Sequence, residues 1–165
     1  MAKMGKFSVK GLKEFQNKLN KIRQGNVEEF INSCAKELVA RLLAVVIART
    51  PVGEYPSGSG KRGGTLRRGW TAKTHEEAVN NTRNSKNARE YANSLTINHV
   101  GNTLIVEVIN PVEYASYVEY GHRTTNHRGW VEGRFMLTIS EQEIQEISPA
   151  ILERKVKQFL GKSMR

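Results

Sequence analysis

The apolar positions in the first fifty residues predict two helices. In residues 8–24 the apolar side chains fall on one helical face, formed by Leu12, Phe15, Leu19 and Ile22. A longer helix is predicted from Asn26 to about Arg49, because Pro51 disfavours helical geometry at the residue before it. Its apolar stripe consists of Phe30, Cys34, Leu38, Leu42 and Val45.

The middle of the chain alternates between loop and strand patterns. Residues 51–64 contain two prolines and five glycines, which predicts a long, exposed, flexible loop. The stretch "TLRRGWTA" at residues 65–72 is expected to be a short strand, and residues 73–93 a polar excursion from the sheet. Residues 95–108 alternate between apolar and polar, with a turn at Gly101 and Asn102, so they predict a β-hairpin.

The C-terminal third returns to helical patterns. Residues 112–121 predict one or two helical turns closed by Gly121, and residues 123–134 are polar and typical of a loop. Residues 135–147 predict a helix, followed by a break or kink at Ser148 and Pro149 and a last helix to about Leu160. The fold class is therefore α+β. We expect one domain over residues 1–165, with a small antiparallel sheet packed against the long helix, flanked by N-terminal and C-terminal helices.

The charge balance suggests an acidic partner. The 165 residues include 26 Lys and Arg against 16 acidic residues, a formal charge of +10, and nucleic acid is the first candidate. The alternative is simply a basic soluble protein. All 16 acidic residues are Glu, so Asp-based triads, Walker-B aspartates and EF-hand loops are excluded. No apolar run has the length of a membrane span. Cys34 is the only cysteine, and its place on the apolar stripe predicts a buried structural thiol.

A glycine motif in the loop does not predict nucleotide binding. Residues 58–63 fit G-x-G-x-x-G, but a dinucleotide fold needs that motif after a strand and before a helix. A P-loop would need Gly where Tyr55 stands and Ser or Thr where Arg62 follows Lys61. We therefore expect no nucleotide cofactor.

Catalytic and metal-binding patterns are equally weak. His122 and His127 lie five residues apart in a predicted loop, without the spacing of a zinc site. Glu113 and Glu119 are candidate acid–base groups, but carboxylates six residues apart on a short helix need not converge. No nucleophile or oxyanion hole is evident, so the chain is not expected to be an enzyme, and no metal is expected.

A basic cluster beside Trp70 is the stronger chemical signal. On a glycine-rich loop it can follow a phosphate backbone without reading bases. The alternative is a solvated loop that fits against a protein partner. The cluster consists of Lys61, Arg62, Arg67 and Arg68.

Four motifs in order resemble one family. They are Thr50-Pro51-Val52, Gly64-Thr65-Leu66-Arg67, Tyr114-Ala115 with Tyr117-Val118-Glu119-Tyr120-Gly121, and Phe135-Met136-Leu137. Together they resemble the head–tail joining, or tail-completion, family of long-tailed bacteriophages and prophages. That resemblance implies a structural virion protein without catalytic residues. It implies a homo-oligomeric ring, commonly of six, at the head-proximal end of the tail, formed in the host cytoplasm during assembly. Its expected partners are the connector or stopper under the portal and the tail tube or tail terminator.

The resemblance also gives expected roles to particular residues. The docking loop is expected to include Tyr55, Gly58, Gly60, Gly63 and Gly64. The basic cluster is expected to contact DNA phosphates in the channel. Tyr117 is expected to pack on the sheet, and the alternative is that it contacts a partner. Most motif positions are expected to be structural; they are Thr50, Pro51, Leu66, Trp70, Tyr114, Tyr117, Glu119, Gly121 and Phe135. The alternative function is that of a basic architectural nucleic-acid-binding protein.

Overall fold

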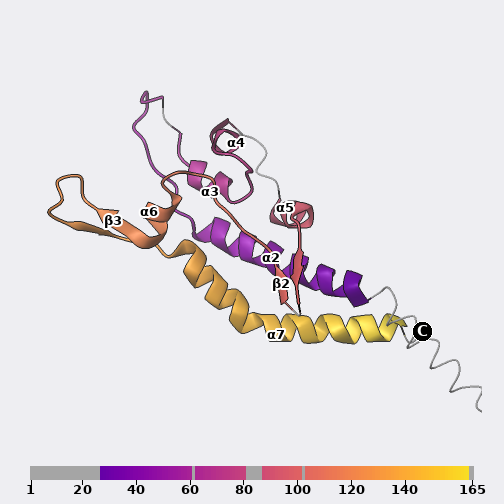
Figure 1. Ribbon diagram of the computed structural model, residues 1–165. Helices are drawn as coiled ribbons and strands as arrows, with labels where there is room; N and C mark the ends of the chain where they lie inside the picture. The colour runs from indigo at the N-terminus through magenta and orange to yellow at the C-terminus, as the bar shows by residue number, and fades with distance from the viewer. Residues whose placement is uncertain (1–26, 61, 81–86, 102, 164–165) are drawn as a thin grey trace, which may run out of the picture. The chain divides into compact units, whose positions relative to one another are not determined.

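The computed structural model describes residues 27–60, 62–80, 87–101 and 103–163 (Figure 1). These residues fall into two compact units, one of residues 27–34 and 150–163 and the other of residues 35–149. Two long helices, α2 (Val27–Arg49) and α7 (Met136–Ser163), contribute residues to both units. The helix predicted over residues 8–24 lies outside the described residues, and the single domain over residues 1–165 stays a prediction. In the part of the chain described, no helix has the length and apolar character that a membrane span requires.

Helix α2 has the predicted bounds, but in the larger unit it buries a different side. The buried positions are Ala40, Leu43, Val46 and Thr50, whereas Leu38, Leu42 and Val45 are only half-buried. Apolar residues occupy nearly every side of this part of the helix, so helical spacing alone does not identify the side that faces the core.

Three short helices follow the loop in the larger unit. Helix α3 (Thr65–Gly69) forms where a strand was predicted, so that prediction is wrong. Leu66, Gly69 and Trp70 are buried at helical spacing, but five residues are too few to separate helical from strand periodicity. The polar excursion contains α4 (His75–Asn80) and α5 (Ala88–Ser94). The core between these helices and α2 is built around Leu43, Val46, Trp70, Tyr91, Val112 and Met136.

Two antiparallel hairpins replace the one small sheet that was predicted. The first pairs β1 (Asn98–Val100) with β2 (Thr103–Ile105), which confirms the predicted hairpin over a shorter range. Helix α6 (Ala115–Tyr120) ends at Gly121 as predicted. The second hairpin, β3 (Gly121–Arg123) with β4 (Trp130–Glu132), lies in a stretch predicted to be a loop. The α+β class is confirmed.

Helix α7 continues through Pro149, so of the predicted break or kink the break is wrong. The Ser148 hydroxyl donates to the Gln145 carbonyl instead of capping a new helix. A proline inside a helix removes one backbone hydrogen bond and costs about 3 kcal/mol. Burial of Ile144 in the larger unit and of Ile151 in the smaller one holds both halves of the helix in helical geometry.

The smaller unit joins the start of α2 to the end of α7. The rings of Phe30 and Phe159 stack with centroids 4.3 Å apart. Lys155 donates from Nζ to the Ser33 carbonyl at 3.1 Å. Cys34 is buried here, which confirms the predicted burial of this thiol.

A buried carboxylate from α6 caps the first turn of the C-terminal helix α7. Glu119 of α6 is 5% exposed, and its two oxygens accept the backbone N–H groups of Leu137 and Thr138, each at 2.9 Å. The Thr138 hydroxyl donates to the same carboxylate at 2.8 Å. The first N–H groups of a helix lack intrahelical partners and favour negative charge, so Glu119 satisfies and stabilises the first turn of α7.

Replacing Glu119 with Ala is therefore expected to lower the free energy of unfolding by about 2–3 kcal/mol, because buried N–H groups lose a charged acceptor. Thermal or urea unfolding of the purified chain measures this change. The matched control is Glu132→Ala on exposed β4, which should change stability by less than about 0.5 kcal/mol. Equal stabilities for the two variants would contradict this role for Glu119.

Candidate assembly surface

A hydrogen-bond network at the end of α2 fixes the base of the glycine loop. Thr50 is fully buried, and its hydroxyl donates to the Val46 carbonyl at 2.6 Å. The indole Nε1 of Trp70 donates to the same hydroxyl oxygen at 2.7 Å. The helix end and the helix after the loop are thereby joined through one side chain.

Two arginines of α3 extend this network with bonds to backbone carbonyls. Arg67 donates from Nε and Nη2 to the Thr50 carbonyl, at 3.1 and 2.7 Å. Arg68 donates from Nε to the Ala78 carbonyl at 2.8 Å and from Nη1 to the Gly63 carbonyl at 3.2 Å. Both side chains are half-buried, so these bonds connect the loop, α3 and α4.

Asn110, which the sequence analysis did not single out, completes the network. Its Nδ2 donates to the Leu66 carbonyl at 2.9 Å, and its Oδ1 accepts the backbone N–H of Val112 at 3.2 Å. A side chain at Gly69 would overlap with this amide. An Asn before a proline at the end of an apolar strand was the only signal that could have singled it out.

The predicted docking loop has a closed base and an open tip. A Cβ atom at Gly63 would overlap with the Gly53 carbonyl, so the two arms of the loop meet there. Gly58 and Gly60 have positive φ values of 87° and 67° with open space around them. All residues from Pro51 to Gly60 are exposed. The loop is thus held at its base and presented to solvent at its tip.

A cavity of about 230 Å³ joins the loop base to α6. Tyr55, Gly63 and Gly64 line it together with Tyr114 and Val118, so the structure brings the predicted loop residues next to the aromatic motif. Burial raises the pKa of the Tyr114 phenol above its ordinary value, and the neighbouring Tyr55 raises it further; Arg68 and a hydrogen bond with Thr65 act in the opposite direction.

The structure separates the four residues of the predicted basic cluster. Arg62 is exposed, whereas the guanidinium groups of Arg67 and Arg68 donate to backbone carbonyls. Lys61 lies outside the described residues. The phosphate contact stays a prediction for all four.

The aromatic motif differs from the expectation of a packed segment. Tyr117 is 58% exposed, so the prediction that it packs on the sheet is wrong. Its neighbour Tyr120 and Trp130 of β4 are also exposed, and Tyr114 and Phe135 are partly so. Residues 115–120 form only one and a half helical turns, and the side that faces the core is occupied by Glu119 rather than by a ring.

His122 packs beside an aromatic ring of the motif. The Tyr117 and His122 rings lie 5.7 Å apart in a tilted arrangement. Among the described residues there is no group of three or more His, Cys, Asp or Glu side chains placed to hold a metal ion.

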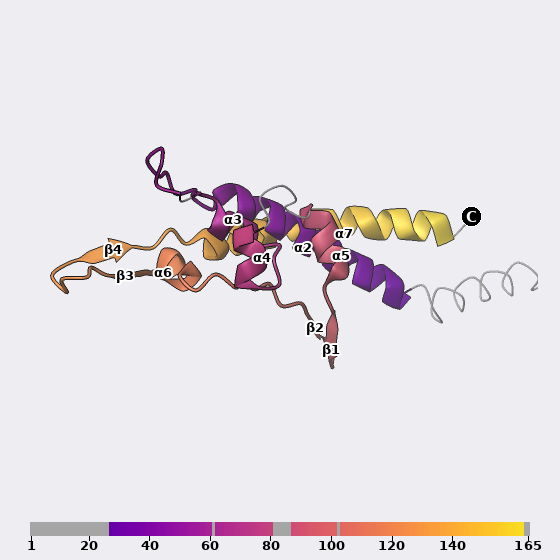
Figure 2. The ribbon, with the colours of Figure 1, turned by 90° about the horizontal axis from the view of Figure 1, so that it is seen from above.

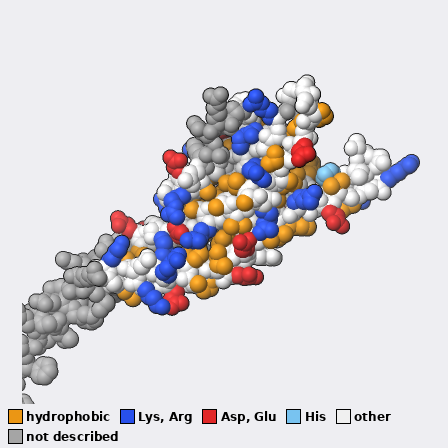
Figure 3. Space-filling model, turned by 180° about the vertical axis from the view of Figure 1, so that it is seen from behind, with side chains coloured by type: hydrophobic (Ala, Val, Ile, Leu, Met, Phe, Trp, Pro, Cys, Tyr) orange, Lys and Arg blue, Asp and Glu red, His pale blue; other side chains and the backbone are white. Residues whose placement is uncertain are grey.

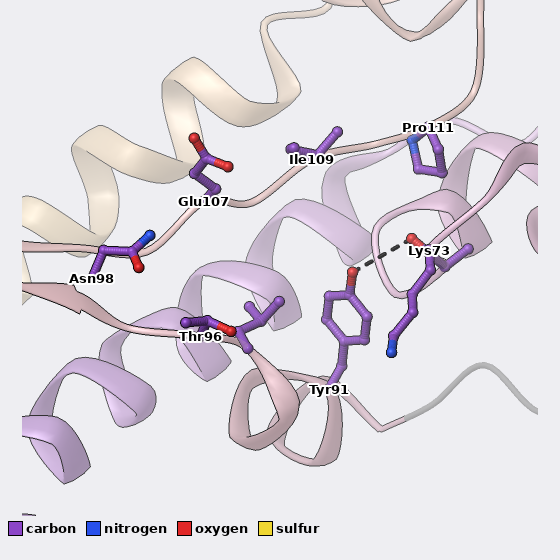
Figure 4. Close-up of a pocket in the computed structure, with 9 residues that line it drawn as sticks. Lys73, Tyr91, Thr96, Asn98, Glu107, Ile109 and Pro111 are labelled. Carbon is purple, nitrogen blue, oxygen red and sulfur yellow. Dashed lines mark hydrogen bonds between the residues drawn. The ribbon is translucent and has the colours of Figure 1, made fainter.

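A cavity of about 320 Å³ lies beside the first hairpin (Figure 4). Lys73 and Glu107 line it from separate segments, and the Tyr91 hydroxyl donates to the Ala72 carbonyl at 3.4 Å. Thr96 and Asn98 lie on the arm of the hairpin that faces Glu107 across the opening (Figure 4). Its wall mixes charged, polar and apolar groups, without a nucleophile set next to a base.

Replacing Arg67 with Gln is expected to lower the free energy of unfolding by about 2 kcal/mol, because the buried Thr50 carbonyl loses its charged donors. The matched control is Arg62→Gln in the exposed loop, expected within about 0.5 kcal/mol of the unchanged protein. Chemical unfolding of both variants measures the difference. A stable Arg67→Gln protein would mean that this guanidinium is not structural.

Comparison with known proteins shows a family to which the chain is similar. A family model described as "Bacteriophage HK97-gp10, putative tail-component" matches residues 13–121, more than half of the chain. No curated protein and no solved structure matches significantly. The matched range includes the Thr50 network, the glycine loop and α6.

Proposed function

The chain belongs to the HK97-gp10-like family of phage tail components, and we propose that it is the neck subunit that completes the tail and joins it to the head. In this proposal the subunit forms a ring at the head-proximal end of the tail and has no enzymatic activity. The observation that carries the proposal is the use of the motif residues: Thr50, Arg67 and Trp70 fix the base of an exposed loop. Residues that hold a loop for contact suit an assembly subunit.

The glycine loop acts as a docking arm in this proposal. Its fixed base reduces the entropy that binding must overcome, while positive φ at Gly58 and Gly60 allows backbone shapes that other residues rarely adopt. Tyr55, 49% exposed, supplies an aromatic side chain of the kind enriched in protein interfaces. The proposed partners are other copies of the chain in a ring of six, the connector or stopper, and the tail tube or tail terminator. The proposed location is the virion neck, reached by assembly in the host cytoplasm.

Electron microscopy of particles from a phage or prophage that lacks this gene tests the proposal. We expect filled heads together with separate or overlong tails, and joined virions again when the wild-type chain is supplied in trans. Normal joined virions without the chain would overturn the proposed neck role.

A contact with DNA in the channel is the second part of the proposal, favoured by the formal charge of +10. Because Arg67 and Arg68 already bond to backbone carbonyls, the sharpest variant replaces only Lys61 and Arg62 with Gln. Its control replaces Arg154 and Lys162, two exposed residues of α7, in the same way.

For this DNA contact we expect virions with the loop variant to lose their genome more readily at low salt, where phosphate contacts are strongest, and to show a weaker dependence on salt than wild type. Virions with the control are expected to behave like wild type. Normal packaging, retention and ejection in the loop variant would contradict the contact. The alternative, a basic architectural nucleic-acid-binding protein, is distinguished by tight duplex binding of the isolated chain with a steep dependence on salt.

A further inference from the structure

The second hairpin carries an exposed aromatic and basic surface. Figure 2 shows β3 and β4 side by side, projecting beyond α6. Figure 3 shows basic and hydrophobic side chains exposed along this projection. Trp130 of β4 is 60% exposed, and Tyr117 and Tyr120 of the adjoining helix α6 are 58% and 62% exposed. Tyr, Trp and Arg are the residues most enriched among those that dominate binding energy. We call Tyr117, Tyr120, Arg123 and Trp130 the arm surface.

The arm surface is held firmly in place. Arg134 and Phe135 donate their backbone N–H groups to the carbonyls of Val118 and Glu119, at 2.8 and 3.0 Å. Side chains at Gly121 and Gly133 would overlap with facing backbone atoms, so the hairpin packs closely on the end of α6. Phe135 has a φ of 48°, a conformation that a bulky residue rarely adopts, and its ring is nevertheless 44% exposed. Because these contacts fix the backbone that carries the exposed rings, less conformational entropy is lost when the rings bind a partner.

The arm also has cations without ionic partners. Arg123 lies directly opposite Trp130 in the hairpin register, so the two share one face. Within the described residues, none of the ion pairs involves Arg123, Arg128 or Arg134. Residues 121–134 contain these three arginines and only one acidic residue, Glu132. The surface therefore favours an acidic partner with apolar side chains.

The first half of α7 has the complementary character. Residues 136–153 contain four Glu and neither Lys nor Arg. Ile139 and Ile147, 40% and 41% exposed, lie on one helical face with Glu143 and Glu146. We call these four residues the helix stripe. Glu143 pairs with Arg49 at 2.8 Å, so Glu146 carries the carboxylate that has no ion pair among the described residues.

We propose that the arm surface of one copy binds the helix stripe of a second copy, with Arg123 facing Glu146 and the rings of the arm covering Ile139 and Ile147. This inference rests on the proposed ring and names the contact that builds it. Because the arm surface and the helix stripe are different patches, the contact is head-to-tail, and repeated contacts of that type close into a ring or continue as a filament. Both patches lie on every copy, so no other protein is needed to complete the contact.

A charge exchange tests this contact. The variants Arg123→Glu and Glu146→Arg are each expected to weaken self-association of the full-length chain about tenfold or more, measured by sedimentation velocity at low salt. An equal mixture of the two is expected to recover association. In the mixture, Glu at position 123 meets Arg at position 146, and each unchanged residue meets its natural partner.

Two control variants carry the same charge changes elsewhere. Glu141 lies on α7 about 140° around the helix from Glu146, and Arg154 lies beyond the helix stripe. Neither Glu141→Arg nor Arg154→Glu should therefore alter association. Trp130→Ala should weaken association with an unchanged melting temperature, since the ring is exposed.

Three results would overturn the contact: a wild-type chain that stays monomeric up to high concentration, association that survives both charge variants, or a mixture that fails to recover it. Binding of the arm only to DNA or to a different tail protein would have the same consequence. None of these results bears on the particles made without the gene, so failure of the contact is distinguishable from failure of the neck role.

Discussion

Thr50 supplies hydrogen-bond partners to polar groups that would otherwise be buried and unpaired in the larger unit. At the end of α2 the backbone carbonyls lack intrahelical donors, and the Thr50 carbonyl is satisfied by two N–H groups of Arg67. The hydroxyl in turn accepts the Trp70 indole, which is 4% exposed in the core. A buried unpaired donor or acceptor costs about 1–3 kcal/mol, so the loop between these residues must leave and return at fixed points.

Glu119 satisfies buried polar groups in the same way at the start of α7. Its carboxylate satisfies the first turn of α7, while the carbonyl of the same residue accepts the N–H of Phe135. The chain between them, residues 120–134, is thereby closed at its base and extends as the β3–β4 hairpin. In both places a buried polar group fixes the root of a projection whose tip is exposed.

This arrangement separates the buried residues that fix each projection from the exposed residues proposed to make contacts. Thr50, Trp70 and Glu119 are buried, and each anchors a segment that carries exposed side chains. Tyr55 in the loop and Trp130 in the hairpin are exposed to about half or more of their area. We therefore expect changes in the first set to lower stability, and we propose that changes in the second set affect assembly.

The sequence by itself determined the long helix to Arg49, the exposed loop, the first hairpin, the end of α6 at Gly121 and the phage tail family. These features depend on local periodicity, on glycine and proline, or on an ordered set of motifs. Tertiary structure alone decided that residues 65–69 are helical, that α7 continues through Pro149 and that Tyr117 is exposed. It also decided that Arg67 and Arg68 bond to backbone carbonyls. In each of these cases the outcome depends on a group that is distant in the sequence and that either forms a hydrogen bond or buries apolar area. Spacing along the chain does not reveal which group that is.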